Sequence, residues 1–97
     1  MPRFIALIDF TAKGIGAIQD TVKRSDAFRE TAAQMGAEIR EVYWTLGAHD
    51  GVLVFDAPDD PTATALVIKL GRAGNVQTKT LRAFERAEMQ KIVEMSG

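Results

Sequence analysis

The residues best suited to chemistry lie in one short stretch around the single histidine. His49 and Asp50 are adjacent, and Tyr43 and Thr45 precede them by a few positions. Histidine titrates near neutral pH without assistance, so His49 is a candidate general acid or base, with Tyr43 as the second catalytic candidate. Hydroxyl, imidazole and carboxylate groups can also orient a small ligand. The candidate ligand-binding residues are therefore Tyr43, Thr45, His49 and Asp50.

Each of these candidates also has an ordinary structural explanation. His49 and Asp50 fall between two strand-like segments, where polar side chains are expected because a turn is solvated. Adjacent strand residues point to opposite faces, so the His49-Asp50 pair is not by itself an imidazole oriented by a carboxylate. Tyrosine is favoured in protein interfaces, so Tyr43 can also be explained as an interface residue. The sequence leaves these alternatives open.

Several classes of function have no support in the composition. The chain has no cysteine and one histidine, so we expect no disulfide, no thiolate chemistry and no metal site within one subunit. The pair Gly14 and Gly16 lacks the third glycine of a dinucleotide fingerprint, and no cofactor is indicated. Twelve basic residues balance 13 acidic ones and are scattered along the chain. We therefore expect neither a nucleic-acid partner nor a membrane partner.

The length and hydrophobic content predict one folded domain over residues 1–97. Apolar residues make up 46% of the 97 residues, which is enough for one core and too few residues for two ordinary domains. No segment approaches the roughly 20 apolar residues of a membrane span. The absence of cysteine is compatible with a reducing cytoplasm, and we expect a cytoplasmic location.

The residue pattern predicts four strands and three helices. Strand-forming segments cover residues 4–10, 37–46, 51–57 and 75–84, and a loop with one helical turn covers residues 11–16. Helical periodicity covers about residues 20–35, 60–71 and 85–95. Asp20 or Thr21 begins the first helix and Gly36 ends it, while Asp60 is expected to cap the second helix, with Pro61 in its first position.

This order of elements predicts an α+β, ferredoxin-like fold. The pattern βαββαβ corresponds to a four-stranded antiparallel sheet with two helices on one face, and here an extra C-terminal helix follows. By alternation, Trp44 belongs with the core side of its strand, whereas Tyr43 and Thr45 point to the other side.

The amount of apolar surface predicts a partner for the second face of the sheet. The first strand carries Phe4 and Ile8 on one side and Ile5 and Leu7 on the other. The large side chains of the hairpin add more apolar surface than one helical layer is expected to cover; they are Tyr43, Trp44, Leu53 and Phe55. We therefore expect a homodimer through the sheet face, with a cleft between the sheet and its mate. The alternative is that the last helix folds back over that face.

Three blocks of the sequence resemble the GYD-domain family. They are Glu41-Val42-Tyr43-Trp44-Thr45-Leu46-Gly47 with Asp50, then Ala57-Pro58-Asp59-Asp60, and Gly74 to Phe84. With the first strand, the resemblance covers almost the whole chain. It implies a small bacterial or archaeal protein of ferredoxin-like, dimeric α/β-barrel type whose biochemical role is undefined. The motif of the family's name corresponds to Gly47, His49 and Asp50, and His49 stands where the pattern has tyrosine.

The function that these features favour is a small homodimeric domain that binds a small molecule or has an accessory role, without chemistry of its own. The alternative is that the protein is an enzyme that resembles the cofactor-independent oxygenases or isomerases of dimeric α/β barrels. Its pocket would be lined by Tyr43 and Thr45, with His49 as a further candidate, and fold analogy alone suggests this enzyme. A third possibility is a subunit that binds only another protein.

Overall fold

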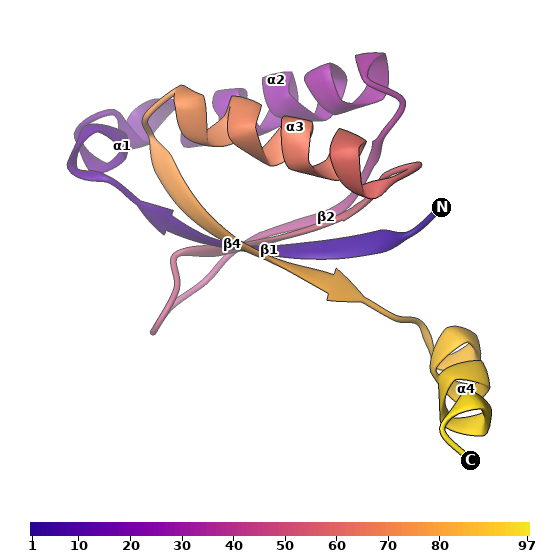
Figure 1. Ribbon diagram of the computed structural model, residues 1–97. Helices are drawn as coiled ribbons and strands as arrows, with labels where there is room; N and C mark the ends of the chain where they lie inside the picture. The colour runs from indigo at the N-terminus through magenta and orange to yellow at the C-terminus, as the bar shows by residue number, and fades with distance from the viewer.

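The core of the molecule is a four-stranded antiparallel sheet with the strand order β2-β3-β1-β4 (Figure 1). The computed structural model describes residues 1–97. β1 pairs with β3 on one side and with β4 on the other, and β2 forms an edge. This order confirms the predicted ferredoxin-like α+β fold. The strands are β1 (Arg3–Phe10), β2 (Glu38–Trp44), β3 (Gly51–Asp56) and β4 (Val76–Ala83).

The two long helices lie side by side on one face of this sheet, and the other face carries no helix (Figure 1). A short helix and a 3-10 turn connect β1 to the first long helix, and the last helix projects away from the end of β4. The helices are α1 (Ala12–Gly16), η1 (Ile18–Asp20), α2 (Thr21–Gln34), α3 (Asp60–Arg72) and α4 (Arg86–Met95). No helix is long and apolar enough to cross a membrane.

The hydrophobic core fills the space between the helices and one end of the sheet. Phe4 of β1 and Phe55 of β3 are cross-strand neighbours whose rings stack with centroids 5.4 Å apart. Leu66 of α3 and Ala32 of α2 close over this pair and are fully buried. Because offset aromatic pairs are stabilising beyond their buried area, this stack anchors the two central strands under the helical layer.

Two of the four large hairpin residues from which the surplus of apolar surface was predicted lie in this core. Leu53 and Phe55 point toward the helices and are almost completely buried. The apolar residues of the opposite face, which we call the open face, come from the alternate positions of the same central strands: Ile5 and Leu7 of β1, and Val52 and Val54 of β3.

Both ends of α2 follow the prediction. The helix starts at Thr21, with Asp20 at the N-cap position, although the side chain of Asp20 makes no capping hydrogen bond. Phe28, Ala32 and Met35 face the core. Gly36 follows with φ +81°, a conformation that glycine adopts without steric cost, and this ends the helix.

The start of α3 corrects the predicted cap by one residue. The N-cap is Asp59 rather than Asp60, and its Oδ1 accepts the backbone N–H of Thr62 at 2.8 Å. Pro61 therefore occupies the second helical position, where its missing N–H is equally harmless. The same hydrogen bond lowers the pKa of the Asp59 carboxyl.

α4 does not fold back over the open face. Glu85 and Glu88 form a reciprocal capping box at its start. None of its residues is buried, and Met89 and Val93 of its apolar stripe are exposed. The alternative that this helix covers the sheet is therefore wrong for the single chain, and both the helix and the open face lack a cover.

A charged cluster marks one end of the open face. The guanidinium of Arg3 lies 2.9 Å from the carboxylate of Asp56, which lowers the pKa of that carboxyl, and it also contacts Glu85 at 2.8 Å. Arg40 approaches Asp56 from β2 at 3.8 Å. These ion pairs connect the N-terminus of β1 to the start of α4.

The position of the α3 cap can be tested with a matched pair of variants. Asp59→Ala removes the acceptor for the Thr62 N–H and should lower the free energy of unfolding by about 1 kcal/mol. Asp60→Ala, one residue along, should change it by less than about 0.5 kcal/mol. Urea denaturation followed by circular dichroism measures both values. Equal losses, or a larger loss for Asp60→Ala, would contradict the assignment.

Candidate functional site

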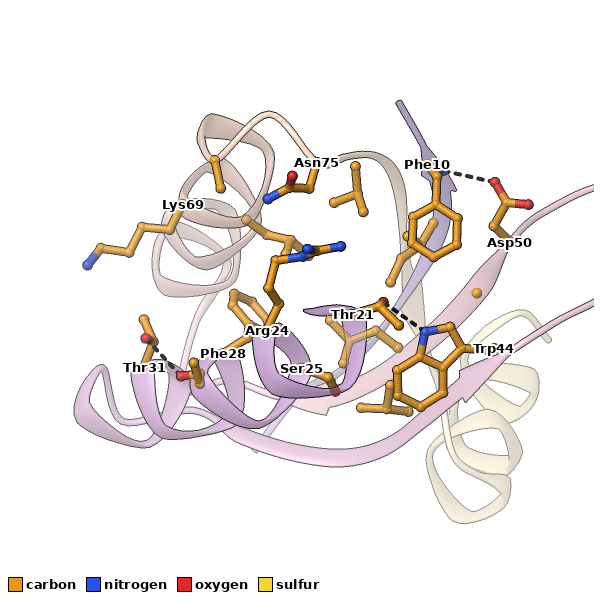
Figure 2. A pocket seen from close by; sticks show the side chains of 18 of the residues that line it. Phe10, Thr21, Arg24, Ser25, Phe28, Thr31, Trp44, Asp50, Lys69 and Asn75 are labelled. Atoms are coloured by element: carbon orange, nitrogen blue, oxygen red, sulfur yellow. Dashed lines mark hydrogen bonds between the residues drawn. The ribbon is translucent and has the colours of Figure 1, made fainter. Parts of the chain in front are cut away.

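The largest cavity lies on the helix-covered side of the sheet, between α2, α3 and the end of the strands opposite the core (Figure 2). Its volume is about 580 Å³, which is in the usual range for small-molecule sites. Eleven of its 20 lining residues are hydrophobic, including Phe10, Phe28 and Leu70. The cavity therefore resembles a ligand pocket in size and character.

Arg24 is the principal polar group of this pocket. It extends from α2 into the cavity, and Figure 2 shows its guanidinium in the space between Phe28, Asn75 and Phe10. Nη1 donates a hydrogen bond to the backbone oxygen of Ala17 at 2.8 Å. Nη2 is buried and has no hydrogen-bond partner. Nη2 is thus the one buried side-chain donor or acceptor without a partner in the chain, and such atoms are unusual in proteins.

Trp44 and Thr21 form another wall of the pocket. The indole Nε1 of Trp44 donates a hydrogen bond to the Thr21 hydroxyl at 3.1 Å, which connects the end of β2 to the start of α2 (Figure 2). Alternation placed Trp44 on the helix side, and the structure agrees. The ring is nevertheless 47% exposed and is not core, because it stands beside the cavity and not beneath packed helices.

A backbone contact fixes the wall formed by the start of β4. Thr11 donates its backbone N–H to the carbonyl oxygen of Asn75, and its hydroxyl donates to the carbonyl of Gly74 at 2.6 Å. Gly14 lies so close that a Cβ at this position would be 2.0 Å from the Asn75 oxygen. Only glycine allows α1 to approach β4 in this way. The Asn75 side chain points from this wall toward the cavity (Figure 2).

The predicted site residues do not converge on the pocket. Tyr43 and Asp50 are among its lining residues, whereas Thr45 and His49 are not. The Tyr43 side chain itself belongs to the open face, since Tyr43 pairs with Val52. Thr45 lies beyond the end of β2, and its hydroxyl donates to the backbone oxygen of His49 at 2.6 Å. Thr45 and His49 thus belong to the closed tip of the β2–β3 hairpin.

Tyr43 and Asp50 are both engaged with other groups. The Tyr43 hydroxyl donates to Glu41 at 3.0 Å, and this hydrogen bond raises the pKa of the phenol. A raised pKa leaves less phenolate near neutral pH, so Tyr43 is less available as a base. Asp50 accepts the backbone N–H of Phe10 at 2.9 Å through its carboxylate. This contact connects the hairpin to the end of β1, so Asp50 has a structural role (Figure 2).

His49 has a carboxylate neighbour that the sequence did not indicate. Its Nδ1 lies 3.2 Å from an oxygen of Asp9, at the end of β1. Neither His49 nor Asp9 lines the pocket, so the imidazole–carboxylate pair is separated from the cavity. No group of three or more histidine, cysteine, aspartate or glutamate side chains is arranged to hold a metal ion.

Sequence reasoning did not identify Arg24 as a pocket residue. The signal was present: Arg24 precedes Phe28 by four positions and thus extends the inward stripe of Phe28, Ala32 and Met35. A charged residue on the apolar face of a helix is unusual and is a reason to look for a site. The other missed polar groups, Lys69 and Asn75, come from segments without such a signal.

Comparisons with known proteins identify the family of the chain. Residues 4–93 match the model of the GYD domain, so the chain belongs to the GYD domain family. It is also similar to a protein of Thermus thermophilus named glutamine synthetase and cystathionine beta-lyase binding protein. The two are 30% identical over 90 residues, which are 92% of this chain and 95% of the relative. These matches confirm the resemblance noted in the sequence.

The structural role of Asp50 can be separated from a chemical one by substitution. Asp50→Ala leaves the Phe10 N–H without its acceptor and should lower the free energy of unfolding by about 1–2 kcal/mol. Asp50→Asn keeps an acceptor oxygen and should recover most of this loss. His49→Ala removes only the partly exposed contact to Asp9 and should cost less than about 0.5 kcal/mol. Chemical denaturation measures all three, and a larger loss for His49→Ala than for Asp50→Ala would contradict this assignment.

Proposed function

We propose that this member of the GYD domain family is an accessory protein that forms a homodimer through the open face of its sheet and binds a metabolic enzyme. The observation that carries the proposal is the uncovered apolar open face. The name of the Thermus thermophilus relative supports the binding role, since it describes a protein that binds two enzymes.

The side chains of the open face support association with a second copy. Ile5 and Leu7 occupy the central strand, and Val52 and Val54 lie beside them on β3. At the two edges, Tyr43 is 55% exposed and Leu81 is 51% exposed. Lys79 and Glu41 flank this patch on β4 and β2, and an exposed apolar patch with a charged rim is typical of an interface.

The total surface of the chain supports the same interpretation. Its accessible surface is 6376 Å², whereas a compact monomer of its mass is expected to expose about 5,500 Å². Its radius of gyration is 14.5 Å, against about 12.5 Å expected for a compact domain of this length. The excess surface is close to the roughly 800 Å² that one partner buries in a standard interface. A second copy is the occupant that the proposal assigns to this surface.

α4 extends the surface that a second copy would cover. Phe84, Met89 and Val93 are exposed on this projecting segment, although their apolar stripe is typical of a packed helix. A helix that extends from one subunit can bury this stripe on the other. The charged cluster of Arg3 and Asp56 would then lie near the rim, where polar residues are usual.

An accessory role fits these residues better than catalysis. The candidate acid–base residue His49 lies outside the cavity, and the hydrogen bond from Tyr43 to Glu41 disfavours loss of the phenolic proton. The residues most suited to chemistry and the cavity most suited to a substrate are therefore separated. The proposal assigns binding, and not turnover, to this fold.

The dimer is tested by light scattering coupled to size exclusion. The unmodified chain should have twice its 10.6 kDa mass at micromolar concentration. Leu7→Lys places a charge in the middle of the open face and should give a monomer, because an unpaired charge at the centre of an interface is strongly unfavourable.

Ile68→Lys is the matched control for the dimer test. Ile68 is exposed on α3, on the helix side of the molecule, so this substitution should leave the mass of the dimer unchanged. Circular dichroism verifies that both variants are folded. A monomeric unmodified chain would overturn the homodimer, and an equal effect of the two lysines would overturn the choice of face.

Partner binding is tested with purified enzymes from the organism that carries this chain. Biolayer interferometry with immobilised chain should give saturable binding of its glutamine synthetase or of its cystathionine beta-lyase at micromolar concentration. An immobilised unrelated ferredoxin-like domain provides the control surface. Absence of binding to both enzymes, with a dimeric and folded chain, would reject the proposed partners while leaving the dimer in place.

A further inference from the structure

We propose that the cavity between α2, α3 and the sheet binds a small amphipathic anion, a molecule with an apolar body and one carboxylate, with Arg24 holding the carboxylate. This inference goes beyond the proposed partner binding. The cavity lies on the side of the sheet opposite the open face, so each site can be present without the other.

The walls of the cavity match the apolar part of such a ligand. Phe10 and Phe28 contribute aromatic rings from β1 and α2, Leu70 contributes an aliphatic side chain from α3, and the ring of Trp44 stands at one side. A cavity of about 580 Å³ is large enough for a molecule with one ring. Apolar walls favour a ligand that removes this surface from water.

The charge of the lining residues is complementary to the carboxylate of the proposed ligand. Three basic residues, Arg24, Lys69 and Arg72, line the cavity together with one acidic residue, Asp50. The carboxylate of Asp50 is already engaged by the Phe10 N–H. Lys69 and Arg72 are exposed, and the Lys69 ammonium points away from the cavity in Figure 2, so Arg24 is the basic group directed into it.

The position of the Arg24 guanidinium determines where a ligand carboxylate can bind. Nη1 is held by the Ala17 carbonyl, which fixes the guanidinium, while Nη2 is buried without an acceptor. A guanidinium is planar and matches a carboxylate through parallel N–H donors. A ligand carboxylate in the cavity would pair with the guanidinium of Arg24, which lines the cavity and is already held in position through Nη1. A neutral amide would offer an acceptor oxygen without the negative charge that strengthens pairing with a guanidinium.

Trp44 provides a built-in reporter for the test. It is the only tryptophan of the chain, and it lines the cavity. Its emission is followed while phenylacetate or its uncharged analogue phenylacetamide is added to the full chain. We expect a saturable change with both probes and at least tenfold tighter binding of the acid. The two probes share a ring and a shape, so the ratio isolates the carboxylate.

Variants on α2 assign the effect to Arg24. Arg24→Met removes the charge and should weaken phenylacetate binding about ten- to a hundredfold while leaving phenylacetamide nearly unchanged. Arg24→Lys keeps the charge and should retain part of the preference for the acid. Lys23→Gln removes a neighbouring exposed charge outside the cavity and should leave both affinities unchanged.

The comparison of acid and amide in the unmodified chain keeps the test decisive even if Arg24→Met does not fold. Equal binding of the two probes would overturn the anion assignment. Failure of both to change the Trp44 emission at millimolar concentration would overturn the pocket. Loss of the acid preference in Lys23→Gln would contradict the role of Arg24. None of these outcomes depends on whether the chain is dimeric or binds an enzyme.

Discussion

The structure depends on the central strand β1, which is apolar on both faces although the chain supplies a helical layer for only one. Phe4 and Ala6 are buried under α2 and α3, while Ile5 and Leu7 face the other way. Burial of apolar surface is the dominant favourable term in folding and association, so each apolar face of β1 needs its own cover. The helices cover the first face, and the second face has no cover within the chain.

The helical layer is itself divided between a packed end and a hollow end. Small residues let the helices approach the sheet closely at the packed end, where Ala6, Ala32 and Ala63 are buried beside the Phe4–Phe55 stack. At the other end, larger side chains and the guanidinium of Arg24 surround a space without filling it. Close packing at one end therefore stabilises the fold, while the other end is free to accommodate a ligand.

The fold was predictable because its signals are local. Strand patterns, caps and the stop at Gly36 all act within a few residues, and they gave the order of elements and the strand faces. The cap of α3 was wrong by one residue because both Asp59 and Asp60 precede Pro61, and only the geometry of the Thr62 N–H selects between them. Local patterns predict which elements form more accurately than they predict the residue at which each element starts.

The site was less predictable because it depends on contacts between distant segments. Sequence reasoning put Trp44 on the correct face but in the core, since alternation gives a side and not the distance to the covering helices. It selected His49 for its chemistry, and the structure puts this residue beside Asp9, 40 positions away. Arg24 becomes a candidate site residue only because the fold places β1, α3 and the end of β2 around it.

The contact between Gly14 and Asn75 has a consequence for reading other chains of the family. Any side chain at this position would push the turn after β1 away from the start of β4, and the wall that carries Asn75 would move with it. The shape of the hollow end therefore depends on the absence of a single methyl group, at a residue that does not itself line the cavity. Family members with glycine at the position of Gly14 can form the same cavity wall. This holds whatever side chains line their cavities.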